Sequence, residues 1–331
     1  MPTTLLSRHS LPLALIPALA LAALPVIASS PTWLTLTVAG LAMGMMLFIM
    51  ASGLTLIFGL MDVLNFAHGA FITVGAYTAS LVLLPMRDWL EADALLRNLA
   101  VLGLAIGVAM VVTALLGSLC ERVLIRAVMG QHLKQILITM GAMIVCEQIV
   151  GVIWGAEQIP LPMPESLRGV IFLGDAVIEK YRLLAVLIGV VIFIAMSLIL
   201  NRSKLGLLIR AGVENPEMVE ALGYRVRSLF IVVFAAGSAL AGLGGVMWGL
   251  YKETLTLSMG GDLMVMVFIV VIIGGLGSVG GCFIAALLMA LLNNYAAFLA
   301  PKFALVSHIV LMMAILLWRP AGLYAIGRRG A

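Results

Sequence analysis

Residues 53–79, GLTLIFGLMDVLNFAHGAFITVGAYTA, place Asp62, Asn65 and His68 inside an otherwise apolar run that extends from about residue 33 to residue 84. A helix of about 20 apolar residues crosses the roughly 30 Å of a bilayer's hydrocarbon core. The run is long enough for two such helices, and a helix satisfies its own backbone hydrogen bonds in lipid. The stretch therefore predicts two membrane helices with a polar interruption between them.

The same apolar pattern recurs along the whole chain. Of the 331 residues, 63% are hydrophobic and 10% are charged, whereas an average soluble domain has about 25% charged residues. Alternating ten-residue strands, typical of a membrane β-barrel, are absent from the sequence. We predict an all-α, polytopic membrane helical bundle with about 8–10 transmembrane helices, forming a single domain over residues 1–331. The predicted spans lie near residues 11–30, 33–60, 64–84, 98–120, 134–154, 182–201, 228–250, 262–279, 281–299 and 303–318.

The basic residues predict how the chain crosses the membrane. The net charge is +4, and the basic side chains lie mostly in short loops between spans, which argues against a nucleic-acid partner. If alternate loops face the cytoplasm, twelve basic residues lie on that side and seven on the other. This bias agrees with the positive-inside rule and predicts cytoplasmic N- and C-termini.

Residues 1–30 form an additional apolar segment with two interpretations. It is either a retained helix or a signal peptide cleaved near Ala28. We favour the helix, because its apolar run is longer than the core of a usual signal peptide.

Sites for covalent chemistry and for metals are not evident. Cys120, Cys146 and Cys282 fall in or beside apolar spans without a CxxC pair, so they are expected to be packing residues. The four histidines are too scattered for a metal site. No nucleophile and base pair is recognisable, and we predict that the chain is not an enzyme and binds no metal.

Residues 274–281, GGLGSVGG, contain the spacing G-x-G-x-x-G. A dinucleotide-binding turn also needs an acid about 20 residues later, but no Asp or Glu follows Asp262. We therefore predict a tight cytoplasmic turn between two spans, made by Gly274, Gly275, Gly277, Gly280 and Gly281. No phosphate-binding P-loop occurs either, so any ATP would have to be used by another chain.

Residues 201–227 form the most charged loop of the chain. Asn215 is placed as an N-cap, Pro216 as the first helical residue and Gly223 as the residue after the helix. The loop therefore predicts a short helix over about residues 216–222, with Met218, Ala221 and Leu222 on an apolar face. Such a helix is either a solvated connector or an element that docks into a groove of a partner protein.

Three stretches resemble one family. GLLIRAGVENPEMVEALGYRV is similar to the cytoplasmic coupling segment of ABC-importer permeases. Residues 53–79 resemble the N-terminal signature of the branched-chain amino-acid ABC permeases of bacteria, and GGLGSVGG and RPAGLY (319–324) agree with that family near its C-terminus, so that the resemblance spans about residues 35–325. The matching residues are Gly206, Arg210, Ala211, Glu214, Asn215, Ala221 and Gly223 in the first stretch, and Asn65, Phe66, Ala67, His68, Gly69, Gly75, Ala76 and Tyr77 in the second.

The resemblance implies a function and a set of partners. It implies the permease subunit of an importer for leucine, isoleucine and valine in the bacterial inner membrane, with urea or short amides as the alternative substrates. It also implies a second homologous permease subunit, two cytosolic ABC ATPases that use ATP and Mg²⁺, and a periplasmic solute-binding protein. The chain itself would bind no cofactor. The ATPase-coupling residues would be Gly206, Arg210, Ala211, Glu214, Asn215, Pro216, Met218, Ala221, Leu222 and Gly223.

The polar residues within the spans have several open roles. They fix the architecture by capping helices and bonding to neighbouring helices, line the translocation pathway, or contact the partner permease. The main rival function is a proton- or ion-coupled secondary transporter that uses Glu147 and His68. The sequence departs from the family at residues 1–30 and at Glu147–Gln148, where an uncharged polar pair is expected. The candidate residues are Asn65, Phe66, His68, Gly69, Tyr77, Glu147 and Gln148.

Overall fold

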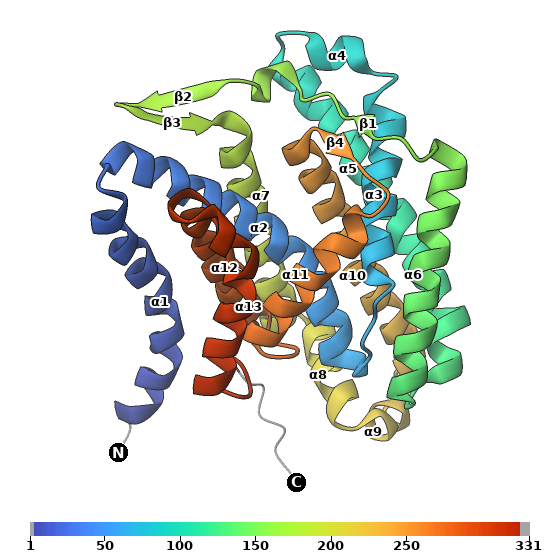
Figure 1. Cartoon of the computed structure of the whole chain (residues 1–331). Coiled ribbons are helices and arrows are strands. Elements are labelled where there is room, and N and C mark those ends of the chain that lie inside the picture. Colours follow the sequence, from blue (N-terminus) through green and yellow to red (C-terminus); the bar gives the residue numbers. More distant parts are fainter. Residues whose placement is uncertain (1–2, 325–331) are drawn as a thin grey trace.

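The chain forms a bundle of apolar helices in a computed structural model that describes residues 3–324, except for the side chains of residues 3–11, 213, 214, 216 and 305. Figure 1 shows these helices running between two ends of the molecule. The all-α prediction is confirmed. The ten apolar helices within these residues are α1 (Thr3–Ile27), α2 (Ser30–Met61), α3 (His68–Leu83), α5 (Leu95–Cys120), α6 (His132–Trp154), α7 (Lys180–Arg202), α10 (Val226–Lys252), α11 (Met259–Gly274), α12 (Val279–Leu299) and α13 (Pro301–Trp318).

The apolar helices differ in length. Six of those in the described part of the chain are long and apolar enough to cross a membrane, counting α5 with the short turns η1 (Glu121–Ile125) and η2 (Arg126–Val128) that continue it. By contrast, α3 and α11 have 16 residues each, or about 24 Å at 1.5 Å per residue. That is less than the roughly 30 Å of a hydrocarbon core, so each reaches only part of the way. The predicted interrupted segment is confirmed.

The two ends of the bundle carry different small elements (Figure 1). One end, the hairpin end, has the short helix α4 (Arg87–Glu91), the turn η3 (Glu165–Leu167) and two antiparallel strand pairs. Strand β1 (Ile159–Pro160) pairs with β4 (Thr254–Leu255), and β2 (Val170–Leu173) pairs with β3 (Ala176–Glu179). The other end, the α9 end, has α8 (Lys204–Glu214) and α9 (Pro216–Ala221). The sequence analysis missed the strands because two to four residues give too little alternation to recognise.

Helix α2 lies at the centre of the bundle, and its residues 42–55 are buried all round. Helices α7, α10, α11 and α12 all contact it. Glycines allow backbones to approach closely, as is common between membrane helices. An added Cβ on Gly75 would lie 2.7 Å from the carbonyl oxygen of Gly242, and one on Gly245 would collide with the backbone of Ile72. These contacts join α3 tightly to α10.

The N-terminal segment packs beside this core. Helix α1 contacts α12 and α2, and Trp33 Nε1 donates a hydrogen bond of 2.7 Å to the Ala20 carbonyl. Residues 3–27 form a helix, and the retention of this segment in the mature protein stays a prediction. These residues lie outside the central core.

Candidate transport pathway and coupling surface

The helical conformation is interrupted between α2 and α3, over residues 62–67, and we call this segment the break. Asp62 adopts a left-handed conformation (φ 52°, ψ 36°) at the end of α2, and its N–H bonds to the Phe58 carbonyl at 3.0 Å. Helix α3 begins only at His68, so the predicted start at residue 64 was wrong. Asn65 lies in the break, where its carbonyl accepts a hydrogen bond of 3.3 Å from His68 N–H.

The break is held between three helices. His68 Nε2 lies 2.9 Å from the carbonyl of Met50 on α2; the carbonyl can only accept, so Nε2 donates and Nδ1 is left as an acceptor. Phe66 N–H donates to Thr139 Oγ1 of α6 at 3.2 Å, and its ring lies 4.6 Å from that of Phe268 on α11. Bonding of His68 to a neighbouring helix, one of the roles left open by the sequence, is thus present in the structure.

Several polar atoms near the break lack a hydrogen-bond partner among the described residues. Both side-chain polar atoms of Asn65 are buried and unpartnered, as are His68 Nδ1 and the Tyr77 hydroxyl. The residue before α3 is Ala67, and no side chain caps that helix, so capping by Asn65 or His68, one of the roles left open by the sequence, is not found. A buried polar group without a partner costs about 1–3 kcal/mol, and such groups in native proteins call for an explanation.

The beginnings of α3 and α11 meet inside the bundle. Gly260 N–H donates to Thr73 Oγ1 at 3.0 Å, and an added Cβ on Gly69 would lie 2.8 Å from the Gly260 carbonyl oxygen and 3.0 Å from the Met143 sulfur. Met143 is the middle residue of α6 (His132–Trp154), so this contact lies level with the middle of a helix that is long and apolar enough to cross a membrane. Both half-helices thus place their N-termini, which carry partial positive charge, at mid-depth. Discontinuous helices of transporters place their ends in this way.

Two carboxylates lie beside this contact. Glu147 is half-buried on α6, one turn beyond Met143, and Gln148 beside it is exposed. Asp262 is exposed in the first turn of α11, accepts a hydrogen bond of 3.2 Å from Ser258 Oγ and interacts electrostatically with Glu147. Within the described residues, the Glu147 carboxylate makes no hydrogen bond or ion pair. The sequence analysis considered Glu147 but missed Asp262, because only the fold brings α11 beside α6.

An acid is expensive in lipid, at about 2.5–3.5 kcal/mol on insertion scales. The face that carries Glu147 and Asp262 is therefore unsuited to contact with acyl chains. It suits contact with water or with another protein. We call this surface, formed by the break 62–67 and by the parts of α3, α6 and α11 around Met143, the midplane face.

The α9 end carries the predicted coupling segment. Helix α9 spans Pro216–Ala221, as predicted to within one residue, and Asn215 Oδ1 accepts the Met218 N–H at 2.9 Å as the predicted N-cap. Gly223 follows with φ +88°, as expected of the residue after the helix. Helix α8 was not predicted. Ser203 caps it by accepting the Gly206 N–H at 3.2 Å.

The predicted coupling residues divide into two groups. One group determines the shape of the helices. An added Cβ on Gly206 would collide with the Leu200 carbonyl at the end of α7, Asn215 caps α9, and Gly223 adopts the left-handed conformation after it. The side chains of Met218 and Leu222 are 63% and 71% exposed. Arg210 bonds to its own helix through the Gly206 carbonyl at 3.3 Å, Ala211 is half-buried and Ala221 is exposed. The side chains of Glu214 and Pro216 lie outside the described part.

The glycine-rich turn at 275–278 is confirmed, and it ends α11 at Gly274 rather than at residue 279 as predicted. Gly275 and Gly277 have φ values of +96° and +84°, which glycine adopts without strain. Added Cβ atoms on Gly274 or Gly281 would collide with the facing backbone, whereas one on Gly280 would meet open space. Ser278 Oγ caps α12 by accepting the Gly281 N–H at 3.1 Å. The segment after α13 packs on this turn, with Leu323 N–H bonded to the Ile273 carbonyl at 2.8 Å.

Comparisons with known proteins agree on one family. Residues 36–317 match the family described as the permease component of the branched-chain amino acid transport system. Relatives include the high-affinity branched-chain amino acid permease BraD of Pseudomonas aeruginosa, 26% identical over 86% of this chain and 93% of BraD. LivH of Escherichia coli is 24% identical over 86% of this chain and 92% of LivH. A probable LivH of Methanocaldococcus jannaschii is 26% identical over 85% and 89%, respectively.

No solved structure matches the chain. The family match covers most of the sequence, including the α2–α3 break, both half-helices and the α8–α9 segment. The chain therefore belongs to the family of branched-chain amino acid transport permease components.

Proposed function

We propose that this chain is the membrane permease subunit of an ATP-binding cassette importer for leucine, isoleucine and valine. It would act in the bacterial inner membrane, with the α9 end and the C-terminus in the cytoplasm. The observation that carries the proposal is α9, a capped two-turn helix that presents Met218 and Leu222 to the outside of the bundle. Apolar side chains four residues apart on one helical face suit docking into a groove.

The structure of the α9 end supports a role in transmitting force. Helix α8 contacts both α7 and α2, and α9 contacts α8 and α10. A displacement of α9 by two ATPase subunits, which would bind ATP and Mg²⁺, would thus reach the central helix of the bundle. The chain itself would hold no cofactor and catalyse no reaction.

The midplane face suits a pathway shared with a second homologous permease subunit. An amino acid is a zwitterion. Its carboxylate is compatible with the N-termini of α3 and α11, and its ammonium group with Glu147 and Asp262. Delivery by a periplasmic solute-binding protein would take place at the hairpin end.

The two neighbouring carboxylates also favour a second candidate, a proton- or ion-coupled transporter that uses Glu147 and His68. Uptake into proteoliposomes containing the complete set of subunits separates the two. The proposal expects uptake that needs ATP on the α9 side and persists when ionophores remove ion gradients. Uptake driven by a gradient without ATP would overturn it.

Association with the ATPase tests the carrying observation directly. In a co-purification experiment, the variant Met218→Glu/Leu222→Glu should lose the ATPase while its melting temperature stays unchanged, because both side chains are exposed. Phe172→Glu is the matched control, since Phe172 is 71% exposed at the opposite end. Equal retention of the ATPase by both variants would contradict the docking role of α9.

Competition in the same proteoliposomes tests the substrate. Excess unlabelled isoleucine or valine should suppress uptake of labelled leucine, whereas urea and acetamide should not. Suppression by urea or acetamide would assign the importer to those smaller solutes.

A further inference from the structure

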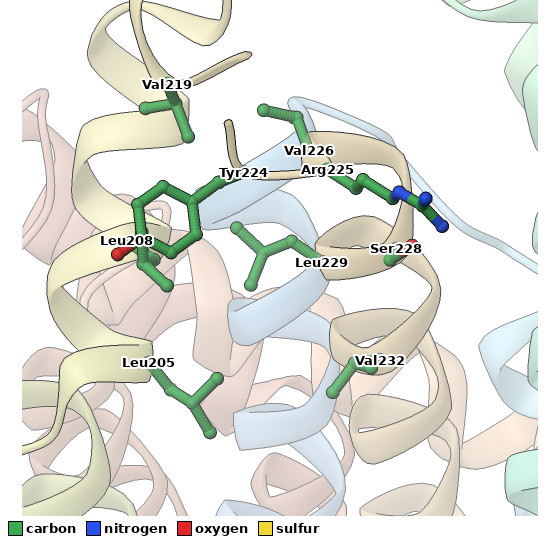
Figure 2. Close-up of a pocket in the computed structure, with 9 residues that line it drawn as sticks. All are labelled: Leu205, Leu208, Val219, Tyr224, Arg225, Val226, Ser228, Leu229 and Val232. Atoms are coloured by element: carbon green, nitrogen blue, oxygen red, sulfur yellow. The ribbon is translucent and has the colours of Figure 1, made fainter. Parts of the chain in front are cut away.

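A groove separates α8 from α10 at the α9 end of the bundle. Figure 2 shows its lining: Leu205 and Leu208 project from α8, Leu229 and Val232 from α10, and Val219 from α9. The cavity has a volume of about 210 Å³ and an almost entirely apolar lining. Tyr224 lies beside Leu208 at the end of the groove nearest to α9, and Leu205 and Val232 lie at the opposite end (Figure 2). The guanidinium of Arg225 points away from the apolar side chains (Figure 2).

The groove lies at the depth where a bilayer changes from headgroups to acyl chains. Helix α7 is a candidate membrane span that ends at Arg202, and α10 is another that begins at Val226. The chain thus leaves and re-enters the membrane at one surface. Leu205 follows α7 by three residues, and Val232 lies about 9 Å into α10 at 1.5 Å per residue. Both side chains are about half-exposed, so the groove opens to the surroundings of the bundle rather than to its core.

Two arginines lie at the mouth of the groove. Arg225 lines it, and an adjoining hollow is lined by Arg225, Arg227, Ser228, Gly223 and Tyr224, with Glu220 as its acidic member. The first turn of α10 has no side-chain cap, and its N–H groups favour an anion. An apolar groove with a cationic mouth at this depth is complementary to a lipid with a negatively charged headgroup.

We propose that this groove binds one anionic phospholipid of the adjoining leaflet. An acyl chain would lie along Leu205, Leu208, Leu229 and Val232, and the phosphate would lie beside Arg225 and Arg227. Transfer of an acyl chain from bilayer to groove gains no hydrophobic energy, since both are apolar, so the selectivity comes from the headgroup. The placement in the cytoplasmic leaflet rests on the proposed function. The lipid site itself does not.

Photolabelling tests the proposal. The full-length chain is placed in nanodiscs that contain phosphatidylglycerol with a diazirine near the acyl end, and the labelled peptides are identified by mass spectrometry. We expect labels on residues 205–208 and 229–232, stronger than with phosphatidylcholine of the same chain by about fivefold for each arginine. Because no ATPase is present, a failure of the proposed docking of α9 does not affect this result.

Matched variants test how much the arginines at the mouth of the groove contribute to the binding of phosphatidylglycerol. Arg225→Gln/Arg227→Gln should reduce labelling by phosphatidylglycerol to the phosphatidylcholine level. Arg202→Gln/Lys204→Gln, which removes two basic side chains near the same surface that do not line the groove, should not. Val232→Trp, which fills the apolar end, should abolish labelling of residues 205–208 in a variant that still elutes as a monodisperse species.

Two results would overturn the proposal. One is equal labelling of the groove by both lipids, which would show that acyl chains enter without selection. The other is cross-linking of a Leu229→Cys variant, in the complete transporter, to an ATPase or to the second permease subunit. That result would show that the groove is a protein interface.

Discussion

The side-chain amide of Asn65 allows the sharpest test at the scale of a single residue, because it is completely buried and has no hydrogen-bond partner among the residues that the structure describes. We expect Asn65→Leu to melt at the same temperature as the wild type or higher, since it removes an unpartnered buried group. Uptake of leucine should nevertheless fall about tenfold or more, equivalent to about 1.4 kcal/mol, if the amide contacts the substrate when the pathway opens. Thermal unfolding and proteoliposome uptake measure the two effects.

Asn98 provides the control for this prediction. Its Nδ2 donates to Ser166 Oγ at 3.0 Å, while its Oδ1 has no partner among the described residues. Asn98→Leu therefore loses one hydrogen bond and should cost about 1 kcal/mol of stability without a specific effect on uptake per folded protein. A lower melting temperature for Asn65→Leu together with normal uptake would mean that Asn65 only stabilises the architecture.

At the scale of elements, the contact between α3 and α10 depends on glycine. Gly245→Ala should destabilise the protein by about 1–3 kcal/mol, because the new methyl group meets the Ile72 backbone and the helices must move apart. Gly103→Ala on α5 is the matched control, since nothing lies within 4 Å of its added Cβ. Thermal unfolding should show no loss for that variant, and an equal loss in both would contradict the close-approach argument.

The capping of α9 is a second prediction at this scale. Asn215→Ala removes the acceptor for the Met218 N–H and should destabilise the helix by about 1 kcal/mol. Hydrogen exchange of the amides of residues 217–221 should accelerate about fivefold, while exchange in α10 stays unchanged. Asn215→Asp keeps a capping oxygen and should exchange like the wild type. Faster exchange in both variants would show that the cap does not decide the stability of α9.

At the scale of the whole molecule, the fold separates two ends that must lie on opposite sides of a membrane. With Cys120, Cys146 and Cys282 replaced by alanine, a cysteine at Asp175 in the hairpin between β2 and β3 should react with an impermeant maleimide on intact spheroplasts. A cysteine at Glu217 in α9 should react only after permeabilisation. The reverse pattern would place α9 outside the cell and remove its proposed role in coupling to a cytosolic ATPase.

The sequence by itself determined much of the local structure of this protein. Apolar runs predicted the membrane helices, because lipid demands internal hydrogen bonding over a fixed length. Asn215, Pro216 and Gly223 predicted α9, and the glycines of 274–281 predicted a turn, because caps and left-handed residues act on their immediate neighbours.

Only the tertiary structure decided where α3 begins, that β1 pairs with β4, and that Asp262 lies beside Glu147. These features depend on contacts between residues far apart in the chain, such as His68 with Met50 and Thr73 with Gly260. A sequence window contains one partner of each pair but not the other. Packing of α6 and α11 around the break, rather than any local preference, brings the polar residues together at the middle of the membrane.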